Sequence, residues 1–114
     1  MTDCLFCKII NGDIPVDIVK ESDHALAFRD INPQAPTHVL VIPKDHISST
    51  NGLNETNMDA LKHMGFLANE VAEDEDIAHD GNRWVINTGD NGGQTVFHIH
   101  LHLLGGRQLL WPPG

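Results

Sequence analysis

The sequence predicts a single α+β domain, built from an antiparallel sheet of about five strands, one short helix and one long helix. Three observations support this fold class. Several short runs alternate polar and apolar residues, as strands with one buried face do. The segment after Thr56 instead repeats its apolar residues every three to four positions, which indicates an amphipathic helix. Turn residues separate these segments, and neither an internal repeat nor a linker divides residues 1–114 into smaller units.

The amino-terminal half is expected to form a short helix, a hairpin and a buried strand. Apolar residues first recur at helical spacing, and two alternating runs then flank a Ser-Asp turn. A proline-rich stretch suits neither helix nor strand, and the β-branched run after it favours a buried strand. In order, the expected elements are a helix over 4–10, strands over 16–21 and 25–29, a loop over 30–36 and a strand over 37–43.

The carboxy-terminal half is expected to hold the long helix and two more strands. Thr56 and Asp59 are spaced to form a capping box where this helix begins. Strands are predicted over 83–88 and 97–104, with a glycine-rich reversal between them, and the proline-rich tail after Trp111 suits no regular element.

The most informative segment is the predicted strand 97–104, in which every second residue is a histidine. Because strand side chains alternate between faces, His98, His100 and His102 are expected to share one face, about 7 Å apart. Such a row can act on phosphorus as nucleophile and proton donor, can bind zinc or non-haem iron, or can simply make a histidine-rich polar face. The apolar residues expected to be buried on the other face are Phe97, Ile99, Leu101 and Leu103.

A glycine-rich loop, Gly89 to Thr95, lies just before the histidines and decides between these interpretations. Glycine permits positive φ values, which can turn successive backbone N–H groups toward one anion. A phosphate cradle beside three alternating imidazoles favours nucleophilic chemistry on phosphorus over a site that only binds metal.

Composition limits the possible partners. A formal net charge of −9 with only seven Lys and Arg argues against binding a nucleic acid polymer. A small phosphorylated ligand is compatible with this charge, because backbone N–H groups can bind its phosphate locally. The acidic run 73–76 is interpreted as a solvated surface. No apolar run approaches the ~20 residues of a membrane span, and two cysteines three positions apart give no disulfide framework. We therefore expect a soluble cytoplasmic protein with no membrane partner, or in a eukaryote one that is also nuclear.

The motif His-Ile-His-Leu-His-Leu-Leu over 98–104 resembles the signature of the histidine triad (HIT) nucleotide-binding proteins. The stretches 30–38, 92–94 and 105–114 resemble the purine nucleoside phosphoramidase (Hint) branch, so the resemblance covers nearly the whole chain. It implies a HIT-like fold, a homodimer whose sheets join into one, and purine nucleotides (AMP or GMP derivatives) as ligands. The implied reaction is hydrolysis of the P–N bond of purine nucleoside 5′-phosphoramidates through a covalent nucleotidyl-histidine.

Two rival functions remain open at this point. A dinucleoside polyphosphate hydrolase would use the same triad, but the short Trp-Pro-Pro-Gly tail favours a phosphoramidase. A non-catalytic nucleotide-binding scaffold would keep the fold, but the intact His100, His102 and Thr95 argue against it.

The resemblance also implies catalytic roles. His100 would attack the α-phosphorus while a main-chain carbonyl holds its other ring nitrogen. His102 and Thr95 would face the leaving group, with Thr95 standing where most relatives carry Ser. His38 would couple to His98, the first member of the triad. The implied nucleotide-binding residues are Phe6, Ile14, Phe28 and Ile31 at the base, Asp30 at the ribose, and Asn87, Gly93, Gln94, Thr95, His100 and His102 at the phosphate.

A metal site is implied by the same resemblance. Cys4, Cys7, His46 and His98 match the four ligands of a structural zinc site found in many bacterial-type triad proteins, although typical members of the Hint branch lack it. The alternatives are two free buried thiols, or a thioredoxin-like pair that lacks the strand such a pair normally follows.

Overall fold

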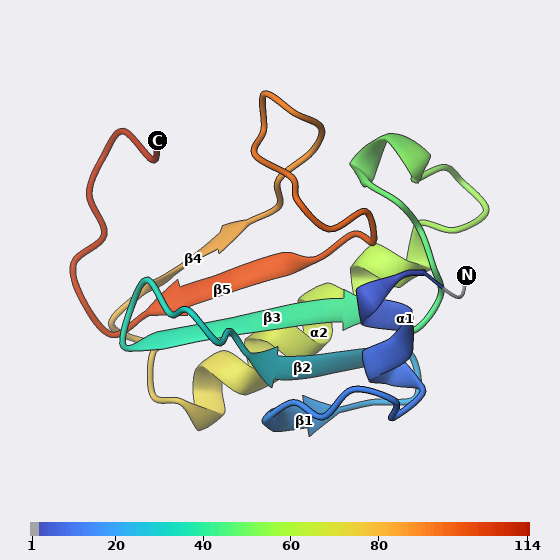
Figure 1. Cartoon of the computed structure of the whole chain (residues 1–114). Helices are drawn as coiled ribbons and strands as arrows, with labels where there is room; N and C mark the ends of the chain where they lie inside the picture. The colour runs from blue at the N-terminus through green and yellow to red at the C-terminus, as the bar shows by residue number, and fades with distance from the viewer. Residues whose placement is uncertain (1–2) are drawn as a thin grey trace.

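Five antiparallel strands, in the order β1-β2-β3-β5-β4, form the sheet of the computed structural model, which describes residues 3–114 (Figure 1). The predicted α+β class and the number of strands are confirmed. The elements are α1 (Leu5–Ile10), β1 (Ile18–Glu21), β2 (Ala25–Arg29), β3 (Thr37–Pro43), a 3-10 turn (Thr50–Gly52), α2 (Asp59–Asp74), β4 (Asn82–Val85) and β5 (Leu101–Gly105).

The sheet has a hydrophobic cluster on each face, because β2 and β3 are buried along their whole length except at Arg29. In β3, Val39 and Val41 belong to the cluster that includes α2. Leu40 and Ile42 point the other way, into the cluster that includes Phe6 of α1. Figure 1 shows the two helices on opposite sides of the sheet. The short helix thereby packs on β2 and β3.

The long helix is present, but the predicted capping box is wrong. α2 begins at Asp59, and its N-cap Met58 makes no side-chain capping bond. Two asparagines organise the chain before it instead: Asn54 Oδ1 accepts from the N–H of Thr56 at 2.8 Å, and Asn57 Oδ1 accepts from the N–H of Asn54 at 2.8 Å. These turns use the backbone groups that a capping box would have organised, and they place Thr56 outside the helix.

Both carboxy-terminal strands are shorter than predicted. β4 ends at Val85 rather than at residue 88, and β5 begins at Leu101 rather than at residue 97. Ile99, Leu101 and Leu103 are buried as expected, but Phe97 is 55% exposed. The alternation therefore fails where the chain leaves the ladder of β5, whose pairing with β3 reaches only from Leu101 to Gly105.

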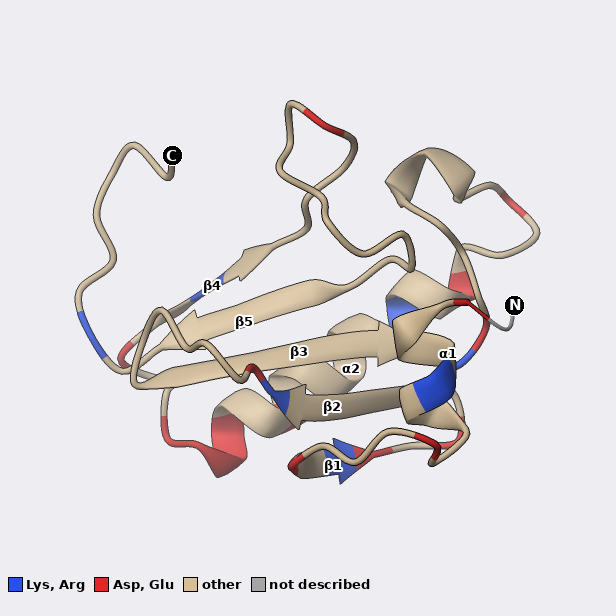
Figure 2. Ribbon diagram, in the orientation of Figure 1, with Lys and Arg blue, Asp and Glu red and all other residues tan. Residues whose placement is uncertain are grey.

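Within the described residues 3–114, Lys and Arg form no basic surface. The seven Lys and Arg lie on separate elements and loops (Figure 2). The acidic run 73–76 is exposed except for Glu75, which Arg29 binds with two hydrogen bonds of 2.8 and 3.0 Å. Within residues 3–114, no helix has both the length and the hydrophobicity that crossing a membrane requires.

Candidate functional site

The three triad histidines lie in the segment that enters β5 and continue into its first residues. His98 is fully buried, His100 is 6% exposed and His102 is partly exposed. The ring centroids of His100 and His102 are 5.0 Å apart, closer than regular strand geometry predicts. His98 and His100 precede the ladder of β5, so their side chains are directed by local contacts rather than by the pleat of the sheet.

One hydrogen bond determines the protonation of His100. Its Nδ1 lies 2.8 Å from the carbonyl oxygen of His98, and a carbonyl can only accept. The Nδ1 atom must therefore carry the proton, which leaves a free lone pair on Nε2 of the neutral ring. The main-chain carbonyl that the resemblance implied is present, and the arrangement suits a nucleophile.

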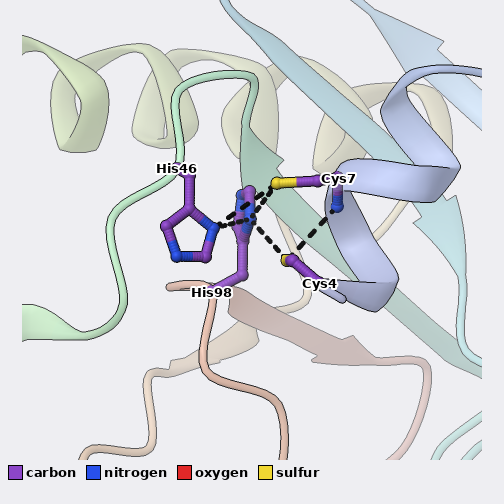
Figure 3. A group of neighbouring side chains, drawn as sticks. All are labelled: Cys4, Cys7, His46 and His98. Carbon is purple, nitrogen blue, oxygen red and sulfur yellow. Dashed lines mark hydrogen bonds between the residues drawn. The ribbon is translucent and has the colours of Figure 1, made fainter. Parts of the chain in front are cut away.

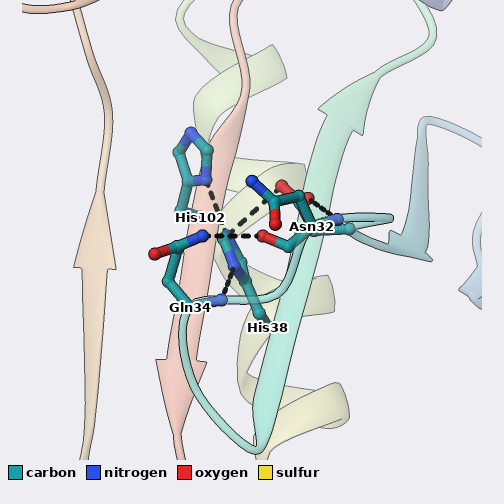
Figure 4. Close-up of polar contacts among 5 residues, drawn as sticks. Asn32, Gln34, His38 and His102 are labelled. Carbon is teal, nitrogen blue, oxygen red and sulfur yellow. Dashed lines mark hydrogen bonds and ion pairs between the residues drawn. The ribbon is translucent and has the colours of Figure 1, made fainter.

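His102 is held by His38, and not by the partner that was expected. The N–H of Gln34 donates to Nδ1 of His38 at 3.0 Å, so the His38 proton is on Nε2. That Nε2 lies 2.9 Å from Nδ1 of His102, which must accept and therefore keeps its own proton on Nε2 (Figure 4). The expected coupling of His38 to His98 is wrong, because the register of β3 and β5 pairs His102 with Leu40 and so makes it the diagonal neighbour of His38.

Asp30 lies at the edge of this network. Its Oδ2 is 3.5 Å from Nε2 of His38, and its Oδ1 accepts from the N–H of Asn32 at 2.8 Å. The carboxylate is partly exposed, with 19% of its side-chain area accessible, so it borders solvent as well as the buried imidazole.

Burial keeps these histidines neutral. Desolvation lowers the pKa of His38, His98 and His100, and hydrogen bonds to main-chain carbonyls oppose it only partly at the latter two. Desolvation, with His100 and His38 as neighbours, lowers the pKa of His102 to about 4. At neutral pH the site therefore contains uncharged imidazoles with defined donor and acceptor nitrogens.

A second cluster joins the beginning of the chain to the triad. Nδ1 of His98 lies 3.4 Å from Sγ of Cys4 and 3.6 Å from Sγ of Cys7, and 3.2 Å from Nδ1 of His46 (Figure 3). The four ligand atoms lie within 4.8 Å of one another. Two thiols and two imidazoles are a donor set that suits tetrahedral zinc.

The orientation of His98 fits a metal ligand. Its Nε2 lies 2.8 Å from the carbonyl oxygen of Pro43, so Nε2 carries the proton and the Nδ1 lone pair faces the thiols. The cluster is compatible with zinc. Within the described residues, His98 groups with the thiols and His102 groups with Asp30 and His38, so the three triad imidazoles do not form one metal site.

The glycine-rich loop has the expected backbone but not the expected free amides. Gly93 has a φ of +79°, and a Cβ at Gly92 would lie 2.3 Å from the carbonyl oxygen of Thr88. However, the N–H of Gly93 donates to Asp90 and the N–H of Gln94 to Gly89, both at 3.0 Å. These two amides close the loop on itself, so they do not contribute to the predicted phosphate cradle.

Side chains also organise this loop. Nε2 of Gln94 donates to the carbonyls of Ser48 and Val96, and Asn87 Nδ2 donates to the carbonyl of Gly92 at 2.7 Å. Gln94 and Asn87 therefore hold the loop in place, whereas Thr95 is exposed beside the triad segment.

The residues expected at the base fall into two groups. Phe6 and Phe28 are 4% and 3% exposed and meet edge to face with centroids 5.7 Å apart. Ile14 is partly buried against the same cluster, whereas Ile31 is 97% exposed. The structure brings three of the four together and leaves Ile31 free on the loop before β3.

Apart from the carbonyl that holds His100, sequence reasoning missed the main-chain groups that orient the histidines. The N–H of Gln34 and the carbonyl of Pro43 each fix one imidazole. No side-chain pattern identifies a main-chain donor or acceptor, although the proline-rich loop 30–36 indicated an ordered segment near His38.

Comparison with known proteins places the chain among close relatives. The HIT domain family matches residues 11–109. The chain is 50% identical to the purine nucleoside phosphoramidase of Escherichia coli K12, over 94% of this chain and 90% of that one, and 50% identical to the 14 kDa zinc-binding protein of Zea mays, over 96% and 87%. The crystal structure of a HIT family hydrolase from Legionella pneumophila Philadelphia 1 superposes with a TM-score of 0.96, at 52% identity, over 98% of this chain and all of that one.

Proposed function

The chain belongs to the HIT domain family, and on this premise we propose that it hydrolyses the P–N bond of purine nucleoside 5′-phosphoramidates. The observation that carries the proposal is the Nδ1–H of His100 bonded to the His98 carbonyl, which leaves Nε2 free to attack. The 50% identity to the E. coli purine nucleoside phosphoramidase supports the substrate class.

The reaction is proposed to proceed in two displacements. Nε2 of His100 forms a bond to the α-phosphorus while the bond from phosphorus to the substrate amine breaks, giving a nucleotidyl-histidine. Water then attacks the same phosphorus and loses a proton, which replaces the one that the amine received, and the bond to His100 breaks to release the nucleoside monophosphate and the neutral imidazole. Burial lowers the pKa of His100, which supports this assignment because the unprotonated ring is the nucleophilic form.

His102 and Thr95 are proposed to serve the leaving group. The leaving amine must receive a proton, and His102 carries its proton on Nε2 when His38 occupies its Nδ1. With a pKa of about 4, His102 is too weakly basic to hold a second proton at neutral pH in the unliganded protein. The negative charge of a bound phosphoramidate raises that pKa, so that His102 takes up a proton from solvent as the substrate binds and, as the imidazolium, passes its Nε2 proton to the amine. The Thr95 hydroxyl would contact the phosphoryl oxygens.

The remaining nucleotide contacts are proposed from the positions of the side chains. Phe6, Ile14 and Phe28 would form the wall against the base, and Ile31 is exposed and free to close over it. Asp30 would accept the ribose hydroxyls, since its carboxylate is partly accessible.

We expect His100→Asn to lower kcat for adenosine 5′-phosphoramidate by at least about 100-fold, because the variant lacks the nucleophilic nitrogen. Affinity for AMP should stay within about fivefold, since burial and the surrounding contacts change little. Steady-state kinetics and calorimetry measure the two quantities. His24→Asn is the matched control, because His24 lies in the β1–β2 turn and stacks on His63 of α2, away from the triad; it should retain full activity.

The same assay separates the rival functions. Faster turnover of a diadenosine polyphosphate than of the phosphoramidate would indicate a dinucleoside polyphosphate hydrolase. AMP binding without turnover of either substrate would indicate a scaffold. Near-normal kcat in the His100→Asn variant would contradict the assignment of the nucleophile.

A structural zinc ion is proposed at Cys4, Cys7, His46 and His98. The converging donor atoms and the resemblance to the maize zinc-binding protein support it. Zinc would join the start of α1 to the segment before β5 and would supply no reacting group. Elemental analysis of the untagged protein should find about one zinc per chain, and Cys7→Ser should lower that content. A folded chain that remains metal-free after incubation with zinc would contradict the site.

A homodimer is proposed through the edge strand β4 and the exposed side of α2. β4 has a neighbour on one side only, and an edge of this kind commonly pairs with another strand. Trp84 is 45% exposed on β4, and Phe66 is 61% and Met58 45% exposed on or beside α2. A cluster of exposed apolar side chains next to an open edge favours a partner surface.

Changing Phe66 to Glu should weaken dimerisation by at least about 100-fold, because a charge would be buried in an apolar contact. Ile18→Glu on β1, the opposite edge of the sheet, introduces the same charge at a residue 53% exposed and serves as the control. Sedimentation equilibrium measures both. A monomeric wild type, or equal effects of the two variants, would show that this surface is not the interface.

A further inference from the structure

The cysteine pair brackets a residue that touches the triad. Phe6 lies between Cys4 and Cys7, at the start of α1. Its ring meets the ring of His100 edge to face, with centroids 5.0 Å apart and planes at 87°, and meets that of His98 at 5.8 Å. The first turn of α1 therefore directs two thiols toward His98 and an aromatic edge against His100.

His98 provides a second connection between the thiols and His100. Its side chain faces Cys4 and Cys7, while its main-chain carbonyl accepts the Nδ1–H of His100 at 2.8 Å. Any displacement of the His98 backbone therefore changes the hydrogen bond that orients the His100 ring.

The segment 98–100 is buried but lies outside the strand ladder. Its pairing with β3 begins only at Leu101, and within it the N–H of Ile99 donates to the carbonyl of Ile47 at 2.7 Å and Nε2 of His98 donates to the carbonyl of Pro43. The cluster residues contact one another through thiol–imidazole pairs at 3.4 to 3.6 Å, which are weak hydrogen bonds, and through one imidazole–imidazole pair at 3.2 Å. Metal–ligand bonds would hold the same groups far more firmly.

We propose that the metal cluster positions the nucleophile: the metal fixes His98 and the first turn of α1, and the His98 carbonyl and Phe6 then hold the His100 ring. Phe6 is a positioning residue in this account, and metal occupancy determines the rate of hydrolysis as well as stability. Small displacements of a reacting group cost large factors in rate, so the loss of these two restraints should lower kcat more than nucleotide affinity. The inference rests on His100 being the nucleophile of the proposed function.

The direct test compares the metal-free protein with the same protein after zinc is restored. Imidazole ¹⁵N–¹H spectra report whether the Nδ1–H of His100 is ordered, and amide exchange in β2 and β3 reports whether the sheet is folded. We expect the metal-free protein to keep its sheet and its AMP affinity within about threefold, to lose the His100 signal, and to lose at least about tenfold in kcat. Zinc should restore both. A folded metal-free protein with an unchanged His100 signal and kcat would overturn the inference.

The variant Phe6→Leu tests, with the metal bound, whether the Phe6 ring positions His100. It keeps the inference testable if the metal-free chain unfolds. It should retain its zinc and fold but broaden the His100 signal and lower kcat by about tenfold. Ile9→Val, in the same helix and the same hydrophobic cluster, should change neither. If Phe6→Leu changes only AMP affinity, Phe6 contacts the base and does not position His100. The ring signal requires no turnover, so a wild type inactive on phosphoramidates would contradict the proposed function without altering this test.

Discussion

The hydrogen bond from Nδ1 of His100 to the carbonyl of His98 decides which nitrogen of that ring can react. Comparable main-chain contacts fix His98, through the carbonyl of Pro43, and His38, through the N–H of Gln34. Backbone groups have one role each, donor or acceptor, so each contact selects one tautomer. Because burial also keeps these rings neutral, the protein controls the direction of proton transfer by geometry rather than by charge.

The topology brings these groups together from distant parts of the chain. Pairing of β3 with β5 places His38 beside His102, and the helix before β1 lies on the face of the sheet where Phe6 packs with Leu40 and Phe28. One consequence is that Cys4 meets His98 across 94 positions of sequence. The other face of the sheet packs against α2 and forms the larger apolar cluster.

Sequence patterns predicted the features that depend on the burial of side chains and missed those that depend on how the strands pair. The strand 37–43 was predicted with its observed bounds, since every residue of it is buried and β-branched residues are frequent. Alternation failed at Phe97 because the chain there lies outside the ladder of β5. The partner of His38 was wrong because strand register is a property of two segments, which spacing within one segment does not reveal. The four cluster residues were predicted through the resemblance, which matches each of them to a ligand position, and the structure brings them together.

The central claim is that His100 attacks phosphorus, and the intermediate itself is the most direct evidence. Mixing the protein with adenosine 5′-phosphoramidate, quenching with base within milliseconds and mapping the peptides by mass spectrometry would locate any bound nucleotidyl group. The account predicts that it is on His100 and that it forms and decays fast enough to carry the steady-state flux. Attachment to His98, His102 or another residue, or product formation without any protein-bound nucleotide, would contradict it.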